Sequence, residues 1–256
     1  LKTTAKRKGD VYVINGQKTW TTLGQHADWI FCLCRTNPEA KKQEGISFIL
    51  IDMKSRGITV RPIQTIDGGF EVNEVFFDDV EVPVANLVGQ ENKGWDYAKF
   101  LLGNERTNIA RVGMFKERIR RVRELASKVE ANGKPLIEDD RFREKLAATE
   151  IELKALELSV MRVIANETKN GKGKPDPASS ILKIKGSDIQ QTISELLVEV
   201  AGPFAAPYIP EEGIGNEEAG WESHTAPHYF NYRKVSIYAG SNEIQRGIIA
   251  KAVLGL

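Results

Sequence analysis

The sequence has few of the residues that build metal sites or disulfide frameworks, with two cysteines and three histidines in 256 residues. Cys32 and Cys34 alternate with apolar residues, so both thiols would point to the same face of an extended strand. Two thiols without clustered histidines make a poor metal site, and we expect them to be reduced packing residues. Reduced thiols are typical of a cytoplasmic protein.

The sequence also lacks a signal-peptide pattern and a hydrophobic run long enough to cross a bilayer. Its net charge of +1 gives no general attraction to nucleic acid or to an acidic membrane surface. A basic cluster between residues 118 and 123 is expected to be a solvated helix face, with CoA phosphates or a partner subunit as the alternative. The first residues, Leu1-Lys2-Thr3-Thr4, include neither an initiating Met nor a helix cap, so we expect an interior piece of a longer chain.

Short hydrophobic runs separated by Gly, Pro, Asn or Asp fill residues 9 to about 83 and predict β-strands. The dipeptide Asn15-Gly16, between the runs 11–14 and 18–22, is a strong hairpin signal. The remaining predicted strands are 29–33, 46–51, 58–60 and 74–77. Short strands at this spacing indicate a partial antiparallel β-sandwich or barrel.

From residue 94 onward the apolar residues recur every three or four positions, which predicts helices. The predicted helices cover about 94–132, 139–169 and 177–200, and a last one begins at about Ser241. The stretch 203–224 is rich in Gly, Pro and Glu and predicts a long loop. A β half followed by long helices indicates an α+β chain, with a β-domain at 1–90 and an all-α helical bundle at 91–256.

Glu105 is the carboxylate with the strongest catalytic signal. It lies four residues after Leu101 and four before Ile109, on the apolar stripe of its predicted helix. Burial raises the pKa of a carboxyl, which suits a base that must take a proton from carbon near neutral pH. The alternative is a structural ion pair, with Arg106 or with an arginine on a facing helix.

Two further stretches carry candidate binding residues. Trp20 and Thr22 would share one face of a strand, although a Trp-x-Thr in a β region usually packs in the core. Ser241 and Glu243 lie in the first turn of the last predicted helix, where free N–H groups and the helix dipole favour an anion. The alternative for that turn is plain capping by Ser241.

Two motifs resemble those of the acyl-CoA dehydrogenases, flavoenzymes that desaturate acyl thioesters between Cα and Cβ. They are Tyr-Ala-Gly-Ser-Asn-Glu-Ile-Gln-Arg at 238–246 and Asn-Glu-Arg at 104–106. Many members of that family have a catalytic Glu directly after the motif tyrosine, where this chain has Ala239. Other branches place the base in a Glu-Arg pair on an earlier helix, so the resemblance implies that Glu105 is the base.

The resemblance covers essentially the whole chain in order. Residues 75–83 are similar to the family's sheet-ending segment, and residues 89–95 to the segment that opens its long helix. The implied enzyme is FAD-dependent: Glu105 removes the α-proton of an acyl-CoA as the β-hydride passes to flavin N5, which gives the trans-2-enoyl-CoA. Implied partners are an electron-transfer flavoprotein and further subunits in a homo- or hetero-tetramer.

In the family, the counterpart of residues 18–24 lies against the flavin ring, and the first turn of the last helix faces the cofactor's pyrophosphate and ribose. Gly202 is what this chain retains of the family's Gln-x-x-Gly-Gly turn, which reaches the adenine portion of a neighbouring subunit's cofactor. The resemblance therefore implies FAD contacts from Trp20, Thr21, Thr22, Gly202, Ser241 and Glu243. It implies substrate contacts from Asn104, Arg106, Tyr238 and Gly240.

The chain departs from the family pattern in two places. The usual Arg-x-x-Phe-Gly segment, whose Arg clamps the pyrophosphate of the adjacent subunit's flavin, is replaced by residues 133–139. The family's N-terminal helical domain and first strands are expected to be absent. One alternative function is therefore a structural subunit of a heteromeric dehydrogenase, similar to the pimeloyl-CoA dehydrogenase large subunit. Another is a flavin monooxygenase or nitroalkane oxidase on the same fold.

Overall fold

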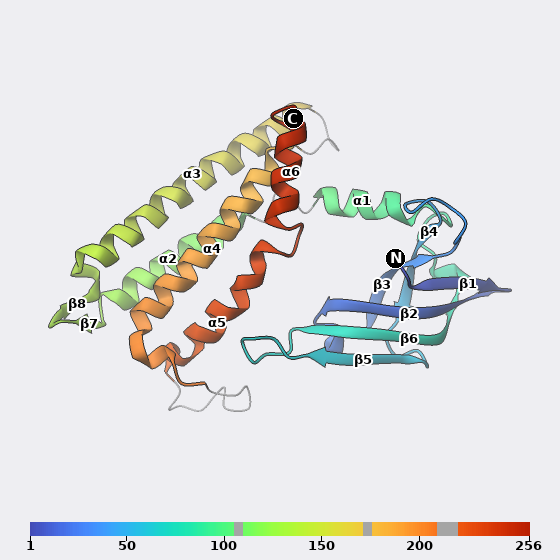
Figure 1. Ribbon diagram of the computed structural model, residues 1–256, viewed down its shortest axis with the longest axis horizontal. Coiled ribbons are helices and arrows are strands. Elements are labelled where there is room, and N and C mark those ends of the chain that lie inside the picture. The colour runs from blue at the N-terminus through green and yellow to red at the C-terminus, as the bar shows by residue number, and fades with distance from the viewer. Residues whose placement is uncertain (105–109, 171–175, 209–219) are drawn as a thin grey trace. The chain divides into compact units, whose positions relative to one another are not determined.

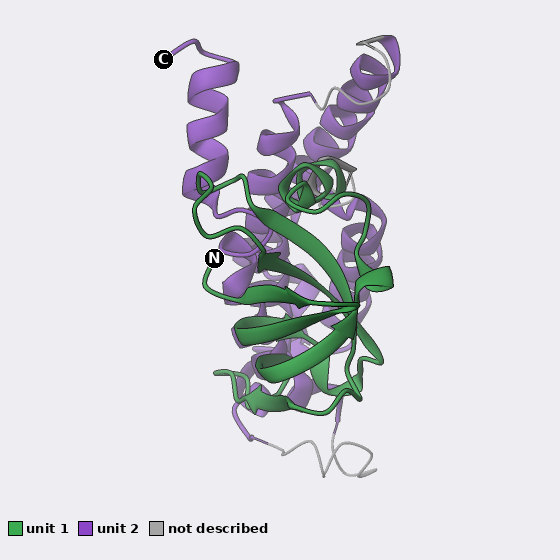
Figure 2. Ribbon diagram, turned by 90° about the vertical axis from the view of Figure 1, so that its right-hand side faces the viewer, with its two compact units in different colours: residues 1–102 green, residues 103–256 purple. Residues whose placement is uncertain are grey.

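The computed structural model describes residues 1–104, 110–170, 176–208 and 220–256 (Figure 1). The chain forms two compact units, Leu1–Leu102 and Gly103–Leu256, which Figure 2 colours separately. A sheet of strands is followed along the chain by a helical bundle, which confirms the predicted α+β order. The domain boundary placed after residue 90 stays a prediction.

The first unit is built around one six-stranded sheet in the order β4-β3-β1-β2-β6-β5. Neighbouring strands are antiparallel except β1 and β3, which are parallel and pair through Thr4 and Arg35, so the sheet is mixed. The strands are β1 (Thr4–Lys8), β2 (Val11–Thr22), β3 (Trp29–Arg35), β4 (Ile46–Asp52), β5 (Ile58–Ile63) and β6 (Val72–Pro83).

Alternate side chains of these strands form the core of the first unit. Cys32 and Cys34 are both buried in it, with their Sγ atoms 3.5 Å apart, which confirms them as packing residues. Among the described residues no group of three or more His, Cys, Asp or Glu side chains could hold a metal ion. The other buried members of this core are Ala5, Tyr12, Ile14, Ile49, Ile51, Val75, Phe77, Val80 and Val82.

The predicted hairpin at Asn15-Gly16 is wrong, because β2 continues through both residues as one strand. Gly16 has φ +137°, and a Cβ there would lie 2.7 Å from the Cα of Thr3. The Asn15 side chain donates to Asp79 Oδ1 (2.8 Å) and accepts from the Asp79 backbone N–H (2.9 Å), where the β2–β6 register shifts. A glycine is therefore required at this position because the backbone at Thr3 passes close to it, and not because the chain turns there.

The second unit is a helical bundle in which α2, α3 and α4 lie side by side (Figure 1). The helices of the chain are α1 (Gly94–Asn104), α2 (Val112–Ala126), α3 (Asp140–Asn170), α4 (Ser179–Ala201), α5 (Thr225–Asn231) and α6 (Asn242–Ala252). The 3-10 turns are Gly24–His26, Val84–Asn86, Leu136–Glu138, Gly202–Ala205, Trp221–His224 and Tyr232–Ser236. Within the described part of the chain, no helix combines the length and the apolar character needed to cross a bilayer.

The bundle core is made by the apolar faces that the three-and-four spacing predicted. The predicted helices 139–169 and 177–200 are confirmed as α3 and α4, within two residues at each end. The buried side chains of this core include Phe115, Val122, Phe142, Leu146, Leu182, Ile193 and Val200.

The single helix predicted over 94–132 is wrong, because the segment contains two helices. Arg111 precedes α2 as its N-cap residue with a left-handed φ of +41°, a conformation that a continuous α-helix does not allow. After α2, the strands β7 (Glu130–Ala131) and β8 (Lys134–Pro135) form a small hairpin. Its turn residues, Asn132 and Gly133, have φ values of +55° and +76°.

Arg118 joins α2 to α5 and to the 3-10 turn that follows it. Its guanidinium lies over the Tyr232 ring, 4.7 Å from the centroid, and donates to the Tyr232 hydroxyl (2.5 Å). The His228 ring contacts the same tyrosine edge-on, with centroids 4.2 Å apart. Burial, and then the charge of Arg118, lower the pKa of His228 from 6.5 to about 4.

The low pKa of His228 predicts that the bundle loses stability in acid. The unfolded chain takes up a proton at a higher pH than the folded one, so the free energy of unfolding decreases as the pH falls from 6.5 to about 4. The expected loss is about 1–2 kcal/mol, because partial solvent exposure screens the effect. Urea unfolding at neutral and acid pH should show this loss in the unsubstituted protein and in His224→Phe, an exposed control, but a smaller one in His228→Phe. Equal losses in all three would contradict it.

Gly16→Ala should destabilise the first unit strongly, because the new Cβ meets the Thr3 backbone as well as an unfavourable φ. Gly9→Ala is the matched control, since Gly9 has φ +61° and open space around it. We expect the free energy of unfolding to fall by about 1–2 kcal/mol in the control, from the unfavourable φ alone, and by more than about 3 kcal/mol in Gly16→Ala. Urea unfolding measures both values, and similar losses in the two variants would show that close approach to Thr3 is unimportant.

Candidate functional site

Trp20 stands out in the first unit because it lies at a β-bulge. The pairing of β2 with β6 shifts between Lys18 and Thr21, and Trp20 has a left-handed φ of +66°. The bulge interrupts the alternation of side chains along β2. Trp20 is 65% exposed, so the interpretation of its motif as core packing is wrong.

The residues after Trp20 run along the end of the same strand. Thr21 pairs with Asn73 on β6, and the Asn73 side chain donates to the Thr21 carbonyl (3.0 Å). Thr22 is exposed, and the chain turns away at Leu23, whose backbone N–H bonds to the Glu71 carbonyl (2.8 Å). An exposed indole beside a threonine hydroxyl could stack on a flat ring and hydrogen-bond to its edge.

In the second unit, the first turn of α6 is fixed by local hydrogen bonds. Ser241 is the N-cap, and its hydroxyl accepts from the Ile244 N–H (3.5 Å), so the capping interpretation is confirmed. Glu243 lies in the same turn. Hydrogen bonds from its own backbone N–H and from the Ser241 hydroxyl hold the pKa of the Glu243 carboxyl below its ordinary value. The turn therefore already carries a carboxylate.

The segment before α6 is strained. Ala239 and Gly240 have left-handed φ values of +54° and +80°. The Gln245 side chain donates to both of their carbonyls, at 3.2 and 3.4 Å. A Cβ on Gly240 would lie 2.5 Å from Gln245 Nε2, which could move aside, so the positive φ is what favours a glycine here. Tyr238, just before the pair, is 40% exposed.

Gly202 is the C-cap residue of α4. It follows α4 with φ +55° and donates its N–H to the Val198 carbonyl. Lys183, near the start of α4, is separated from Gly202 by most of the helix, about 28 Å at 1.5 Å per residue. Lys183 bonds to Asn242 at the start of α6. Gly202 and the α6 turn of one chain are thus too far apart to contact the same part of one ligand.

The predicted catalytic residue lies outside the described part of the chain. Glu105 and Arg106 belong to the stretch 105–109, and Asn104 is the last residue of α1. Trp20, Thr21 and Thr22 belong to the first compact unit, whereas Tyr238, Gly240, Ser241 and Glu243 form one continuous turn in the second. Sequence reasoning missed Lys183, which is 2% exposed. The sequence does contain a signal that could have found it, because polar residues recur every four positions, at 183, 187 and 191, along a predicted helix with an apolar face.

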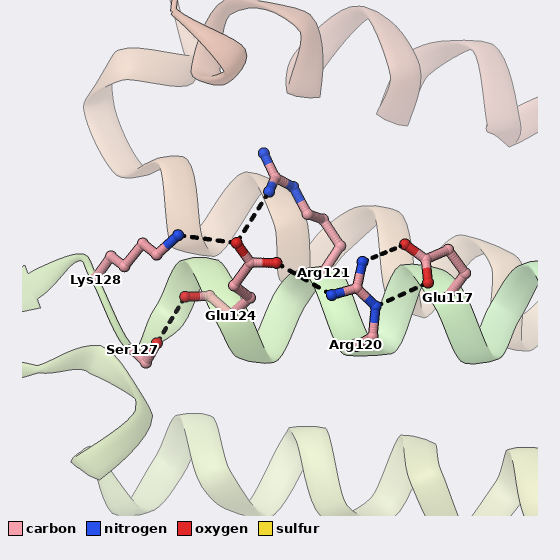
Figure 3. Close-up of polar contacts among 6 residues, drawn as sticks. All are labelled: Glu117, Arg120, Arg121, Glu124, Ser127 and Lys128. Carbon is pink, nitrogen blue, oxygen red and sulfur yellow. Dashed lines mark hydrogen bonds and ion pairs between the residues drawn. The ribbon is translucent and has the colours of Figure 1, made fainter.

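The basic cluster of α2 is a solvated face, as expected, apart from Arg118. Arg120 and Arg121 pair with carboxylates of the same helix, and Glu124 accepts from Lys128 as well (2.8 Å) (Figure 3). The basic side chains in these pairs are 46–65% exposed. Exposed pairs of this kind contribute little stability, and their charges are already balanced.

Ser241→Ala should lower the free energy of unfolding by about 1 kcal/mol, because the Ile244 N–H loses its acceptor. Ser241→Asp is the matched variant, since aspartate caps a helix N-terminus equally well. Urea unfolding should place Ser241→Asp near the unsubstituted protein. If Ser241→Ala had no effect, the 3.5 Å contact would not be a stabilising cap.

Comparison with known proteins adds the family context. Residues 1–80 match the family model "Acyl-CoA dehydrogenase, middle domain", and residues 92–254 match "Acyl-CoA dehydrogenase, C-terminal domain". Acyl-CoA dehydrogenase FadE26 of Mycobacterium tuberculosis is 34% identical over 261 residues, which cover all of this chain and 64% of FadE26. Acyl-CoA dehydrogenase IpdE1 of the same organism is 34% identical, with all of this chain and 62% of IpdE1 covered.

Solved structures agree. A chain of the ChsE4–ChsE5 complex from Mycobacterium tuberculosis matches all of this chain and 64% of its own length, with a TM-score of 0.82 and 32% identity. The steroid acyl-CoA dehydrogenase Tcur3481–Tcur3483 has a TM-score of 0.83 and 28% identity, with the same coverage. The chain spans less than two thirds of these relatives. Because the two family models together match most of its residues in order, the chain belongs to the acyl-CoA dehydrogenase family.

Proposed function

We propose that this protein is an FAD-dependent acyl-CoA dehydrogenase that desaturates an acyl-CoA thioester, with Glu105 as the base. The observation that carries the proposal is the match to the middle and C-terminal domains of that family, in order, on either side of residues 81–91. The Glu105-Arg106 pair lies inside the second match. Glu105 supplies a carboxylate, which the side chain of Ala239 does not have.

The described residues fit two parts of FAD. Trp20 offers an exposed aromatic face and Thr22 an exposed hydroxyl, which suit the flavin ring and its polar edge. Ser241 and Glu243 offer oxygen acceptors at the start of α6, which suit ribose hydroxyls. A pyrophosphate near the same turn would need a cation to offset Glu243, and Lys183 is the buried cation beneath it.

The residues of the chain would have the following roles in the reaction. FAD, when bound, supplies the acceptor for the hydride. Glu105 takes the proton from the substrate α-carbon, and an apolar surrounding would raise its pKa toward neutrality. Tyr238 and Gly240 flank the thioester, and Asn104 and Arg106 contact the substrate beside the base. Holding base and substrate in a reactive arrangement can lower the barrier by about 7–11 kcal/mol.

The proposal extends to partners. The substrate is an acyl-CoA, electrons leave to an electron-transfer flavoprotein, and the protein is active in the cytoplasm as a homo- or hetero-tetramer. The large separation between Gly202 and the α6 turn supports more than one subunit per cofactor, because Gly202 would contact the cofactor of a neighbour. Similarity to a chain of the ChsE4–ChsE5 complex supports a heteromeric assembly.

A second candidate is a non-catalytic structural subunit of a heteromeric dehydrogenase. Ala239 favours it, since this side chain cannot accept a proton at the position where many family members carry the base. In that case the partner subunit would supply the base, and Glu105 would form a structural ion pair.

Glu105→Gln separates the two candidates. In the FAD-loaded protein encoded by the complete gene, this variant should retain flavin but reduce acyl-CoA turnover by about three orders of magnitude, because the amide cannot accept the α-proton. Anaerobic stopped-flow absorbance of the bound flavin measures the rate.

Glu117→Gln is the control, because Glu117 is an exposed partner of Arg120 on α2. Its rate should be unchanged. Turnover that survives Glu105→Gln would remove Glu105 as the base and favour the structural subunit. Return of activity in the double variant Glu105→Gln with Ala239→Glu would place both positions beside the same α-proton.

A further inference from the structure

Lys183 is a buried cation in the helical bundle. Its side chain is 2% exposed, although lysine is almost never fully buried without a partner. The ammonium donates to Asn242 Oδ1 (2.8 Å), and Asn242, the first residue of α6, is itself 7% exposed. Burial lowers the pKa of Lys183, while the nearby carboxylates of Glu243 and Asp188 act in the opposite direction. The bundle thus places a positive charge directly behind the first turn of α6.

Lys183 begins a polar stripe on α4 with a spacing of four residues. One turn further on, the Ser187 hydroxyl lies 2.8 Å from the Lys183 carbonyl and 3.3 Å from the Val235 carbonyl, and its single proton is shared between them. After another turn, Gln191 donates to the carbonyls of Tyr232 and Arg233 (3.3 and 3.2 Å). Residues four apart on a helix lie on one face, so these three side chains hold the chain from 232 to 242 against α4.

Lys183 is one of the charged groups that act on the first turn of α6. Glu243 is ionised, because hydrogen bonds within the turn and the charges of Arg246 and Lys183 all hold its pKa low. The Lys183 ammonium is bonded to a neutral amide, so its charge is free to act on the turn. In a buried setting such a charge acts over several ångströms with little screening. Arg246 also lies 4.0 Å from Glu243, but both side chains are exposed and solvent screens this pair. Without Lys183, the carboxylate of Glu243 would therefore repel a second anion more strongly.

We propose that Lys183 is a positioning residue for the cofactor. Through Asn242 it fixes the first turn of α6, and its charge offsets Glu243 so that this turn can accept the ribose and pyrophosphate of FAD. This inference rests on the proposed function, since it assigns a role toward the same cofactor. It also accounts for a buried ammonium that the core packing of the bundle does not require.

Titration of the flavin-free protein with FAD, followed by flavin fluorescence, tests the inference directly. Lys183→Met keeps an unbranched side chain one atom shorter but removes the charge and the bond to Asn242, and should weaken FAD binding by about tenfold or more. Lys185→Met is the matched control on the same helix, where an exposed ammonium pairs with Glu152 (2.7 Å). It should leave the dissociation constant for FAD within about twofold.

Two further variants distinguish charge from packing. Asn242→Asp keeps a partner for Lys183 but neutralises its charge, so FAD binding should weaken by about fivefold or more while the thermal midpoint is kept. Glu243→Gln in the Lys183→Met background removes the unbalanced carboxylate and should restore most of the lost affinity. A purely structural Lys183 would give neither result. Asn242→Asp also tests the inference if Lys183→Met does not fold.

The outcomes separate the two proposals. If the unsubstituted protein binds FAD and both Lys183→Met and Asn242→Asp bind it within about twofold, the role of Lys183 is wrong and the proposed function stands. If the unsubstituted protein binds no FAD, the proposed function fails, and the inference fails with it.

Discussion

The hydrogen bond between the buried ammonium of Lys183 and Asn242 is the interaction on which the candidate site of the helical bundle depends. An ionised group in an apolar interior is costly unless it is bonded, so few arrangements of α6 on α4 satisfy it. Ser187 and Gln191 extend the same stripe to the backbone before α6. The strained pair Ala239-Gly240 is then enclosed between two fixed segments, and Gln245 bonds to both of its carbonyls.

The contact between Lys183 and Asn242 connects the packing of α6 on α4 to the cofactor binding proposed for this protein. The Glu243 carboxylate in the first turn of α6 is offset by two cations, the Arg246 guanidinium of the same helix (4.0 Å) and the buried Lys183 ammonium, so the turn could accept a negatively charged ligand. Gly202 lies at the far end of α4, too far from the α6 turn of its own chain for both to contact the same part of one ligand.

Sequence patterns predicted what depends on local interactions and missed what depends on distant ones. The apolar spacing gave α3, α4 and the start of α6 to within two residues, because each helix buries one face. The dipeptide Asn-Gly forms a hairpin turn at Asn132-Gly133, where both residues take positive φ, but lies inside a strand at Asn15-Gly16. There, contacts with Thr3 and Asp79 decide the conformation, and no local signal contains them. The bulge at Trp20 and the burial of Lys183 likewise depend on β6 and α6.

In the proposed enzyme, Glu105 and a bound flavin would act on the two sides of one acyl thioester. The most direct measurement is anaerobic mixing of the FAD-loaded protein with a panel of acyl-CoA thioesters that includes short, long and steroid side-chain acids. We expect at least one of them to bleach the flavin absorbance and yield a 2-enoyl-CoA. Flavin that stays bound and oxidised with every thioester would contradict it.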